Sequence, residues 1–155
     1  QQTSRPIKVI QQAAKVNHQQ LIDYYHNINV ECEVADFFRD MPTKYQAADI
    51  VICRSGAATI AELIYVGLPA ILIPLPTAAN DHQTYHAKLL TAKGGAIYLD
   101  QLQADSKVLA QELIQLEKDR AKLEHMSKNL LEMRTDGTKN FTDRIISILV
   151  CSSLT

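Results

Sequence analysis

The sequence lacks the features that mark membrane-spanning, secreted and metal-binding proteins. No stretch approaches the ~18 consecutive apolar residues that a membrane-spanning helix needs. Residues 1–5 are polar and do not open a secretory signal. The 3 cysteines (Cys32, Cys53 and Cys151) are far apart, and no C-x-x-C pair is present. This excludes the usual zinc and dithiol patterns, so we expect a cytoplasmic protein in a reducing compartment.

Two further absences reduce the classes of ligand and partner that we expect for this chain. The formal net charge is −1 and no dense run of Lys or Arg appears. The overall charge therefore gives no electrostatic attraction to nucleic acid, and no nucleic-acid partner is expected. No G-x-G-x-x-G is present, which disfavours a dinucleotide site.

What is present suits a globular domain with one core. The chain has 155 residues, of which 46% are hydrophobic and 21% charged. We expect residues 1–155 to form a single domain, helical from about residue 105.

Short apolar runs alternate with helical patterns along the chain. The expected strands are 7–10, 30–35, 49–53, 70–75 and 96–99. The expected helices are 18–28, 42–48, 57–66 and 82–93, followed by a helical segment over 105–150 that breaks near 136–137. Cys53 lies in an apolar strand and is expected to pack as a small hydrophobe. The fold class is therefore α/β: a Rossmann-like, doubly wound parallel sheet with helices on both faces.

In such sheets, ligands bind at the carboxyl ends of the strands. The turn Arg54–Thr59 lies at one such end and opens a helix, whose first N–H groups have no internal partners and attract anions. Gly56 would admit a ligand closely, and Ser55 and Thr59 carry hydroxyls that can donate hydrogen bonds. The alternative is that Ser55 merely caps the helix and Gly56 makes a tight turn.

Three other groups of residues are candidates. Glu62 follows Thr59 by one helical turn and could accept both hydroxyls of a ribose, although the spacing alone favours a solvated Glu near a helix start. Of Phe37 and Phe38, one could pack inward while the other shields a flat ring; the simpler interpretation, favoured by the residues alone, places both in the core.

The Asn80–Gln83 segment offers amide, carboxylate and imidazole groups that suit sugar hydroxyls, or a plain N-cap at Asn80 or Asp81. His82 and His86 have the spacing of a metal pair, but no third ligand accompanies them, and we expect no metal.

At these residues the sequence resembles a known family. ADIVICRSGAATIAEL, followed by GLPAILIPLPTAANDHQTYHA, closely resembles the C-terminal half of the MurG family of UDP-N-acetylglucosamine transferases. VADFFRDMPTKYQAADI upstream and KGGAIYL downstream fit the same family, and the likeness spans roughly residues 7–150. It implies the donor-binding half of a two-domain GT-B enzyme, which adds N-acetylglucosamine to lipid I to make lipid II in peptidoglycan synthesis.

The resemblance also implies roles for particular residues. The backbone near Phe38 would bind uracil, with Phe37 and Met41 nearby. Ala57–Thr59 would face the diphosphate and the sugar, Glu62 would take the ribose hydroxyls, and Gln83, supported by Asp81 and His82, would contact the N-acetylglucosamine. The expected substrate-binding residues are Phe37, Phe38, Met41, Arg54, Ser55, Gly56, Ala57, Ala58, Thr59, Glu62, Asp81, His82 and Gln83. Donor binding would need no metal or other cofactor.

The sequence departs from the family in three places. The glycine-rich loop with a His that opens the family's N-terminal domain is absent, so no catalytic base is assigned and that acceptor domain is an expected partner. Gln11–Ala14 replaces the usual His-Gln-Ser/Thr-Gly, and no ligand contact is assigned there. His86 stands where Asn is usual, which leaves its contact with the sugar open.

The whole enzyme would work at the inner face of the cell membrane. The alternatives are a stand-alone donor subunit of a dolichol-pathway transferase and a non-catalytic nucleotide-binding module.

Overall fold

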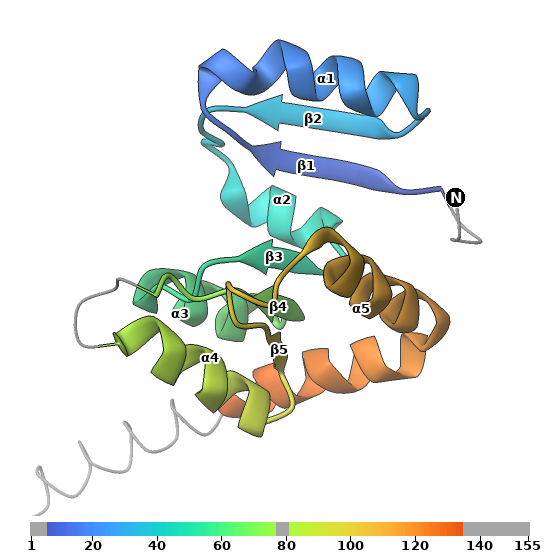
Figure 1. Cartoon of the computed structure of the whole chain (residues 1–155). Coiled ribbons are helices and arrows are strands. Elements are labelled where there is room, and N and C mark those ends of the chain that lie inside the picture. Colours follow the sequence, from blue (N-terminus) through green and yellow to red (C-terminus); the bar gives the residue numbers. More distant parts are fainter. Residues whose placement is uncertain (1–5, 77–80, 135–155) are drawn as a thin grey trace, which may run out of the picture. The chain divides into compact units, whose positions relative to one another are not determined.

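The computed structural model describes residues 6–76 and 81–134, and the chain divides into two compact units, residues 1–47 and 48–155. All the strands pair in parallel: β1 with β2 in the first unit, and β3, β4 and β5, in that order, in the second. Every crossover between paired strands contains a helix (Figure 1). The α/β, Rossmann-like prediction is confirmed.

The first unit is a parallel strand pair with its crossover helix. It contains β1 (Lys8–Gln12), the 3-10 turn η1 (Lys15–Asn17), α1 (His18–Asn27), β2 (Glu31–Ala35) and α2 (Met41–Ala47). The register runs from Lys8 opposite Glu31 to Gln12 opposite Ala35. The Tyr25 hydroxyl on α1 donates to Gln11 Oε1 on β1 at 2.7 Å, which ties the helix to the strand.

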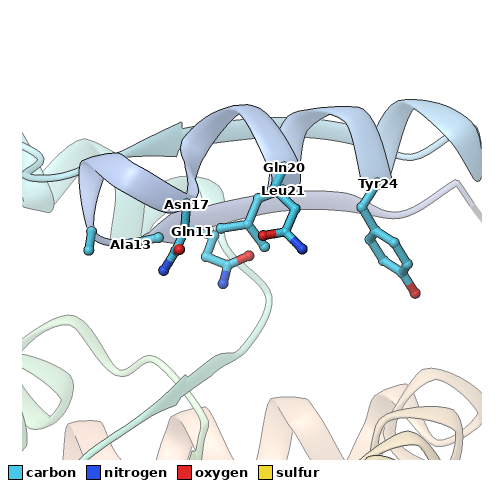
Figure 2. A pocket seen from close by; sticks show the side chains of 7 residues that line it. Gln11, Ala13, Asn17, Gln20, Leu21 and Tyr24 are labelled. Carbon is cyan, nitrogen blue, oxygen red and sulfur yellow. The ribbon is translucent and has the colours of Figure 1, made fainter.

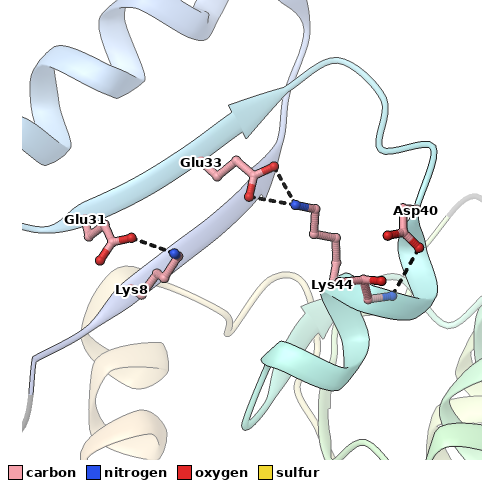
Figure 3. A network of polar contacts seen from close by, with 6 residues as sticks. Lys8, Glu31, Glu33, Asp40 and Lys44 are labelled. Carbon is pink, nitrogen blue, oxygen red and sulfur yellow. Dashed lines mark hydrogen bonds and ion pairs between the residues drawn. The ribbon is translucent and has the colours of Figure 1, made fainter.

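Polar contacts hold α2 to the strand pair (Figure 3). The Lys44 ammonium lies 2.6 and 2.8 Å from the two carboxylate oxygens of Glu33. It also lies 5.4 Å from the centre of the Phe38 ring, a favourable cation–π distance. Lys44 therefore fixes α2 against β2 and covers one face of Phe38.

The second unit is a three-stranded parallel sheet with helices on both faces. Its strands are β3 (Val51–Cys53), β4 (Ala70–Leu72) and β5 (Ala96–Tyr98). Its helices are α3 (Ala57–Val66), α4 (His82–Ala92), α5 (Ser106–Lys118) and a helical segment that begins at residue 120 and continues through residue 134. Figure 1 shows α3 and α4 on one side of this sheet and the two later helices on the other.

The alternation of β4 side chains divides the core between the two faces. Ile71 packs with Leu116 of α5 and with Leu123 and Met126 of the following helix. Ala70 and Leu72 point to the opposite face, where α3 and α4 lie, and both are fully buried. Because both faces are covered, β4 is apolar throughout, as a central parallel strand should be.

Two element boundaries differ from the predicted ones by more than two residues. The strand predicted over 70–75 ends at Leu72; Ile73 N–H still bonds to the Cys53 carbonyl, but Pro74 has no N–H to continue the ladder. The C-terminal helical segment breaks at Asp119, where no break was predicted, and Asp119 Oδ1 accepts from the N–H of Lys122. The predicted break at 136–137, the apolar stripe at Ile145–Leu149 and Cys151 lie outside the described residues. No described helix has the length and apolar character needed to cross a membrane.

Candidate functional site

The β3–α3 turn presents backbone N–H groups at the carboxyl end of the sheet. Gly56 is the N-cap of α3, and the first backbone bond of the helix runs from Ile60 N–H to the Gly56 carbonyl at 2.9 Å. As the N-cap residue, Gly56 has no side chain that could cap this helix start. Ala57 and Ala58 are exposed. The N–H groups of residues 56–59, hereafter the anion site, therefore stand at the positive end of the helix dipole.

Ser55 does not cap α3, so the simple capping interpretation is wrong. Its side chain is 0% exposed, and its hydroxyl donates to the Gln83 carbonyl on α4 at 2.7 Å. The hydroxyl is committed to joining two helices because a buried hydroxyl needs a partner. Of the two predicted hydroxyl donors, only Thr59 lies on α3 itself.

Gly56 is not required by the backbone, so the tight-turn interpretation is also wrong. Its φ of −64° and ψ of 149° suit any residue. A Cβ built at this position meets nothing within 4 Å. Gly56 therefore leaves open space next to the first N–H groups of α3, where a bound anion would lie.

Arg54 connects the ends of three strands. Its Nη1 donates to the carbonyls of Ile73 and Pro74, at 2.9 and 3.0 Å, and to Gln101 Oε1 at 2.6 Å. These acceptors follow β4 and β5, so the guanidinium spans the carboxyl edge of the sheet. Sequence analysis did not identify Gln101, because no local sequence pattern predicts a contact between residues that are 47 positions apart.

The first turn of α4 borders the same edge. Gln83 Oε1 accepts from the Leu75 N–H at 3.0 Å, and its carbonyl holds Ser55. Asp81 occupies the N-cap position with a φ of 55°, but its side chain caps no N–H of α4. Asp81 and His82 are both exposed. The structure thus brings Gln83 to Ser55 directly, whereas Asn80 lies outside the described residues.

Glu62 is exposed on α3, three residues after Thr59. Residues three apart in a helix share a face, so the carboxylate stands one turn beyond the anion site. Ile60 and Leu63 are buried, which turns the Glu62 face away from the core.

The adjacent phenylalanines of the first unit point to different surroundings. Phe38 is 7% exposed and Phe37 is 67% exposed. The prediction that both lie in the core is therefore wrong for Phe37, and the alternative of one ring inward and one outward holds. Met41 is the first residue of α2 and is partly buried.

A hollow of about 560 Å³ lies beside α1 in the first unit (Figure 2). Its walls carry no charge, and Figure 2 shows the amides of Gln11, Asn17 and Gln20 and the ring of Tyr24 turned to one side. It is lined by Gln11, Ala13, Ala14, Asn17, Gln20, Leu21 and Tyr24. Sequence analysis assigned no ligand contact there, although Asn17, Gln20 and Tyr24 have the spacing of one helix face.

Cys53, at the end of β3, is a partly buried thiol. Burial raises the pKa of its thiol to about 11, because a partly buried thiolate is poorly solvated. The thiol is protonated at neutral pH and packs as the small hydrophobe that was predicted. Across residues 6–76 and 81–134, no three His, Cys, Asp or Glu side chains cluster in a way that would hold a metal ion.

Comparison with known proteins gives consistent matches. Residues 1–144 match the family described as glycosyltransferase family 28 C-terminal domain. The UDP-N-acetylglucosamine–N-acetylmuramyl-(pentapeptide) pyrophosphoryl-undecaprenol N-acetylglucosamine transferase of Rickettsia massiliae is 42% identical over 148 residues, which are 96% of this chain and 39% of the relative. The transferase of the same name from Rickettsia prowazekii is 43% identical over 136 residues, 88% of this chain and 35% of the relative. These names specify undecaprenol, which disfavours the dolichol-pathway alternative.

Solved structures give the same result. The crystal structure of Acinetobacter baumannii MurG matches with a TM-score of 0.75 and 32% identity, over 82% of this chain and 39% of that one. The glycotransferase of kitacinnamycin matches with a TM-score of 0.61 at 18% identity, over 94% of this chain and 43% of that one, which supports the fold alone. The chain thus spans about two fifths of the length of its relatives. With a family match over residues 1–144, it belongs to the glycosyltransferase family 28 C-terminal domain family.

Proposed function

We propose that this chain is the donor-binding part of an inverting transferase that moves N-acetylglucosamine from UDP to lipid I, giving lipid II. The observation that carries the proposal is the open anion site at the start of α3, where Gly56 leaves space and, as the N-cap, provides no capping side chain. The names of the Rickettsia relatives support the choice of donor and acceptor.

The anion site is assigned to the diphosphate of the donor. Several parallel N–H groups and the helix dipole favour a doubly charged group without a bound cation. As the bond to the sugar breaks, negative charge grows on the departing UDP, and the same N–H groups stabilise it. This assignment makes donor binding independent of a metal.

Glu62 is assigned to the ribose. A carboxylate accepts two hydrogen bonds at once, and the two vicinal hydroxyls of a ribose supply them. Its place one turn beyond Thr59 supports this role, since the ribose follows the diphosphate in UDP. The uracil is assigned to the loop of Phe37, Phe38 and Met41 on the family resemblance, with the exposed Phe37 ring supporting an apolar contact.

Gln83, with Asp81 and His82, is assigned to the hydroxyls of the sugar. Gln83 Oε1 already accepts from the Leu75 N–H, so its amide can offer the sugar the two Nε2 donors and the remaining lone pair of Oε1. The general base that deprotonates the acceptor hydroxyl is assigned to the N-terminal domain of the whole enzyme, which would act at the inner face of the membrane.

Titration calorimetry of this chain with UDP, UDP-N-acetylglucosamine and NAD tests the proposal. We expect saturable binding of the two uridine ligands and none of NAD. Absence of uridine binding, or equal binding of NAD, would leave a nucleotide-binding or interaction module as the better interpretation. Because the base is assigned elsewhere, transfer to a lipid I analogue by this chain alone would contradict the proposed division of labour.

Glu62→Ala provides a point test of the ribose assignment. Loss of two hydrogen bonds to a charged acceptor should weaken UDP binding by roughly 10- to 100-fold. Glu124→Ala, which removes an exposed glutamate from the helix over 120–134, is the matched control and should bind UDP normally. Equal affinities for the two variants would refute the ribose role.

A further inference from the structure

His86 contacts the backbone of the turn that opens α3. Its Nδ1 lies 3.1 Å from the Ser55 carbonyl oxygen, although the two residues are 31 positions apart. A carbonyl can only accept, so Nδ1 must carry the proton. The neutral ring is therefore the Nδ1–H tautomer, which is fixed by this contact.

A second hydrogen bond joins Ser55 to α4, the helix that carries His86. Its hydroxyl donates to the Gln83 carbonyl at 2.7 Å, while its own carbonyl accepts from His86. One turn of α4 thus binds both the side chain and the backbone of a residue that is fully buried. The two bonds run in opposite directions, so together they fix the position and the rotation of Ser55.

The carbonyl held by His86 belongs to the same peptide unit as the N–H of Gly56. The unit is planar, and its C=O and N–H point in opposite directions. A bond that fixes the Ser55 carbonyl therefore also aims the Gly56 N–H, which belongs to the anion site. The restraint matters here because glycine has the greatest backbone freedom of any residue. The space around the missing Cβ of Gly56 is also empty, so no packing there holds the backbone in place.

We propose that His86 is a positioning residue for the anion site, acting through the Ser55–Gly56 peptide unit. The inference rests on the proposed function, because the anion to be bound is the diphosphate of a uridine donor. The ring serves as a donor to the protein rather than as a ligand for the sugar. The order of the first N–H groups of α3 thus depends on a side chain from α4.

The geometry of asparagine gives a sharp test. The amide nitrogen of Asn is separated from Cβ by the same number of bonds as Nδ1 of His, so His86→Asn can donate to the Ser55 carbonyl. His86→Leu fills similar space without a donor. Thr91→Ala is the matched control, because it removes a local bond to the Ala87 carbonyl within the same helix.

UDP affinity is measured by calorimetry for the chain and these three variants, with the unfolding midpoint of each recorded. We expect His86→Leu to weaken UDP binding about tenfold, the equivalent of one hydrogen bond, and His86→Asn to stay within about threefold. Thr91→Ala should bind as the unmodified chain does. Unchanged affinity of His86→Leu, or an equal loss in His86→Asn, would overturn the inference.

The ring tautomer supplies a readout that does not depend on UDP. The ¹⁵N shifts of the His86 ring at pH 8 should show a protonated Nδ1 and an unprotonated Nε2; the opposite tautomer would overturn the inference. Failure of the unmodified chain to bind UDP would instead count against the proposed function, and the tautomer would still decide whether His86 holds Ser55.

Discussion

Arg54 Nη1 donates to Gln101 Oε1 at 2.6 Å and links the end of β3 to the loop after β5. The same nitrogen also donates to the carbonyls of Ile73 and Pro74, which follow β4. One side chain therefore holds together three of the loops around the anion site. Because Arg54 is exposed, the bonds compete with water and each contributes modestly.

The shared bond predicts non-additive losses of stability. Arg54→Ala should lower the free energy of unfolding by about 1–2 kcal/mol and Gln101→Ala by about 0.5–1 kcal/mol. The double variant should lose less than the sum, because both single changes remove the same bond. Urea denaturation of the four proteins measures this coupling. Strictly additive losses would show that the contact does not persist in solution.

Two glycines should respond oppositely to alanine. At Gly56 the backbone suits any residue and there is open space, so Gly56→Ala should leave stability unchanged or raise it by up to about 1 kcal/mol. The new methyl group would occupy the anion site and should weaken UDP binding by at least about tenfold.

Gly67 is the contrasting position. Its φ of 72° is costly for alanine, and a Cβ there would lie 2.7 Å from Leu131 Cγ. Gly67→Ala should therefore lower the free energy of unfolding by roughly 1–3 kcal/mol. Thermal unfolding and UDP calorimetry on Gly56→Ala and Gly67→Ala show whether each glycine is needed for ligand binding or for stability of the fold. A destabilised Gly56→Ala with intact UDP binding would reverse our interpretation of Gly56.

The raised pKa of Cys53 predicts slow alkylation in the folded state. With a folded pKa of about 11 instead of its ordinary 9.0, the thiol at pH 9 is largely protonated when folded and about half ionised when unfolded. Iodoacetamide labelling followed by mass spectrometry should show a rate roughly 50-fold lower in buffer than in urea at this pH. Equal rates would mean that the thiol is not shielded.

The raised pKa of Cys53 also makes the free energy of unfolding depend on pH. Well below pH 9 the thiol is protonated in both states and contributes no pH dependence. Between pH 9 and about 11 the unfolded chain ionises first, so unfolding becomes more favourable as the pH rises. Cys53→Ala should reduce this alkaline loss of stability, which urea denaturation at pH 8 and pH 10.5 measures.

Local signals in the sequence predicted most of the fold. The helix over 57–66 was predicted with its observed bounds, because the apolar strand before it and Gly67 after it are strong local signals. The strand at 70–75 was predicted too long because apolar character continues past Leu72, while the ladder stops at Pro74. The turn Arg54–Thr59 was likewise predicted at a strand end, where the topology of parallel sheets places ligands.

The contacts that organise the site were not predictable from these signals. Ser55 looked like an N-cap because capping is the common role of serine before a helix, yet its hydroxyl bonds to Gln83 on another helix. His86 and Gln101 carry no local pattern that announces Ser55 and Arg54 as partners. Such pairings depend on how α3, α4 and the loop after β5 meet in space, and a single sequence does not encode that in its periodicity.

Phe37 and Phe38 separate a surface role from a core role at adjacent positions. Phe38 is 7% exposed and lies under Lys44, so Phe38→Ala should lower the free energy of unfolding by roughly 3–4 kcal/mol. Phe37 is 67% exposed, and Phe37→Ala should change stability by less than about 0.5 kcal/mol. Since the Phe37 ring is assigned near the uracil, its removal should weaken UDP binding severalfold while leaving inorganic diphosphate binding unchanged. Calorimetry with both ligands distinguishes the assignments, because an equal effect on UDP and diphosphate would place Phe37 away from the base.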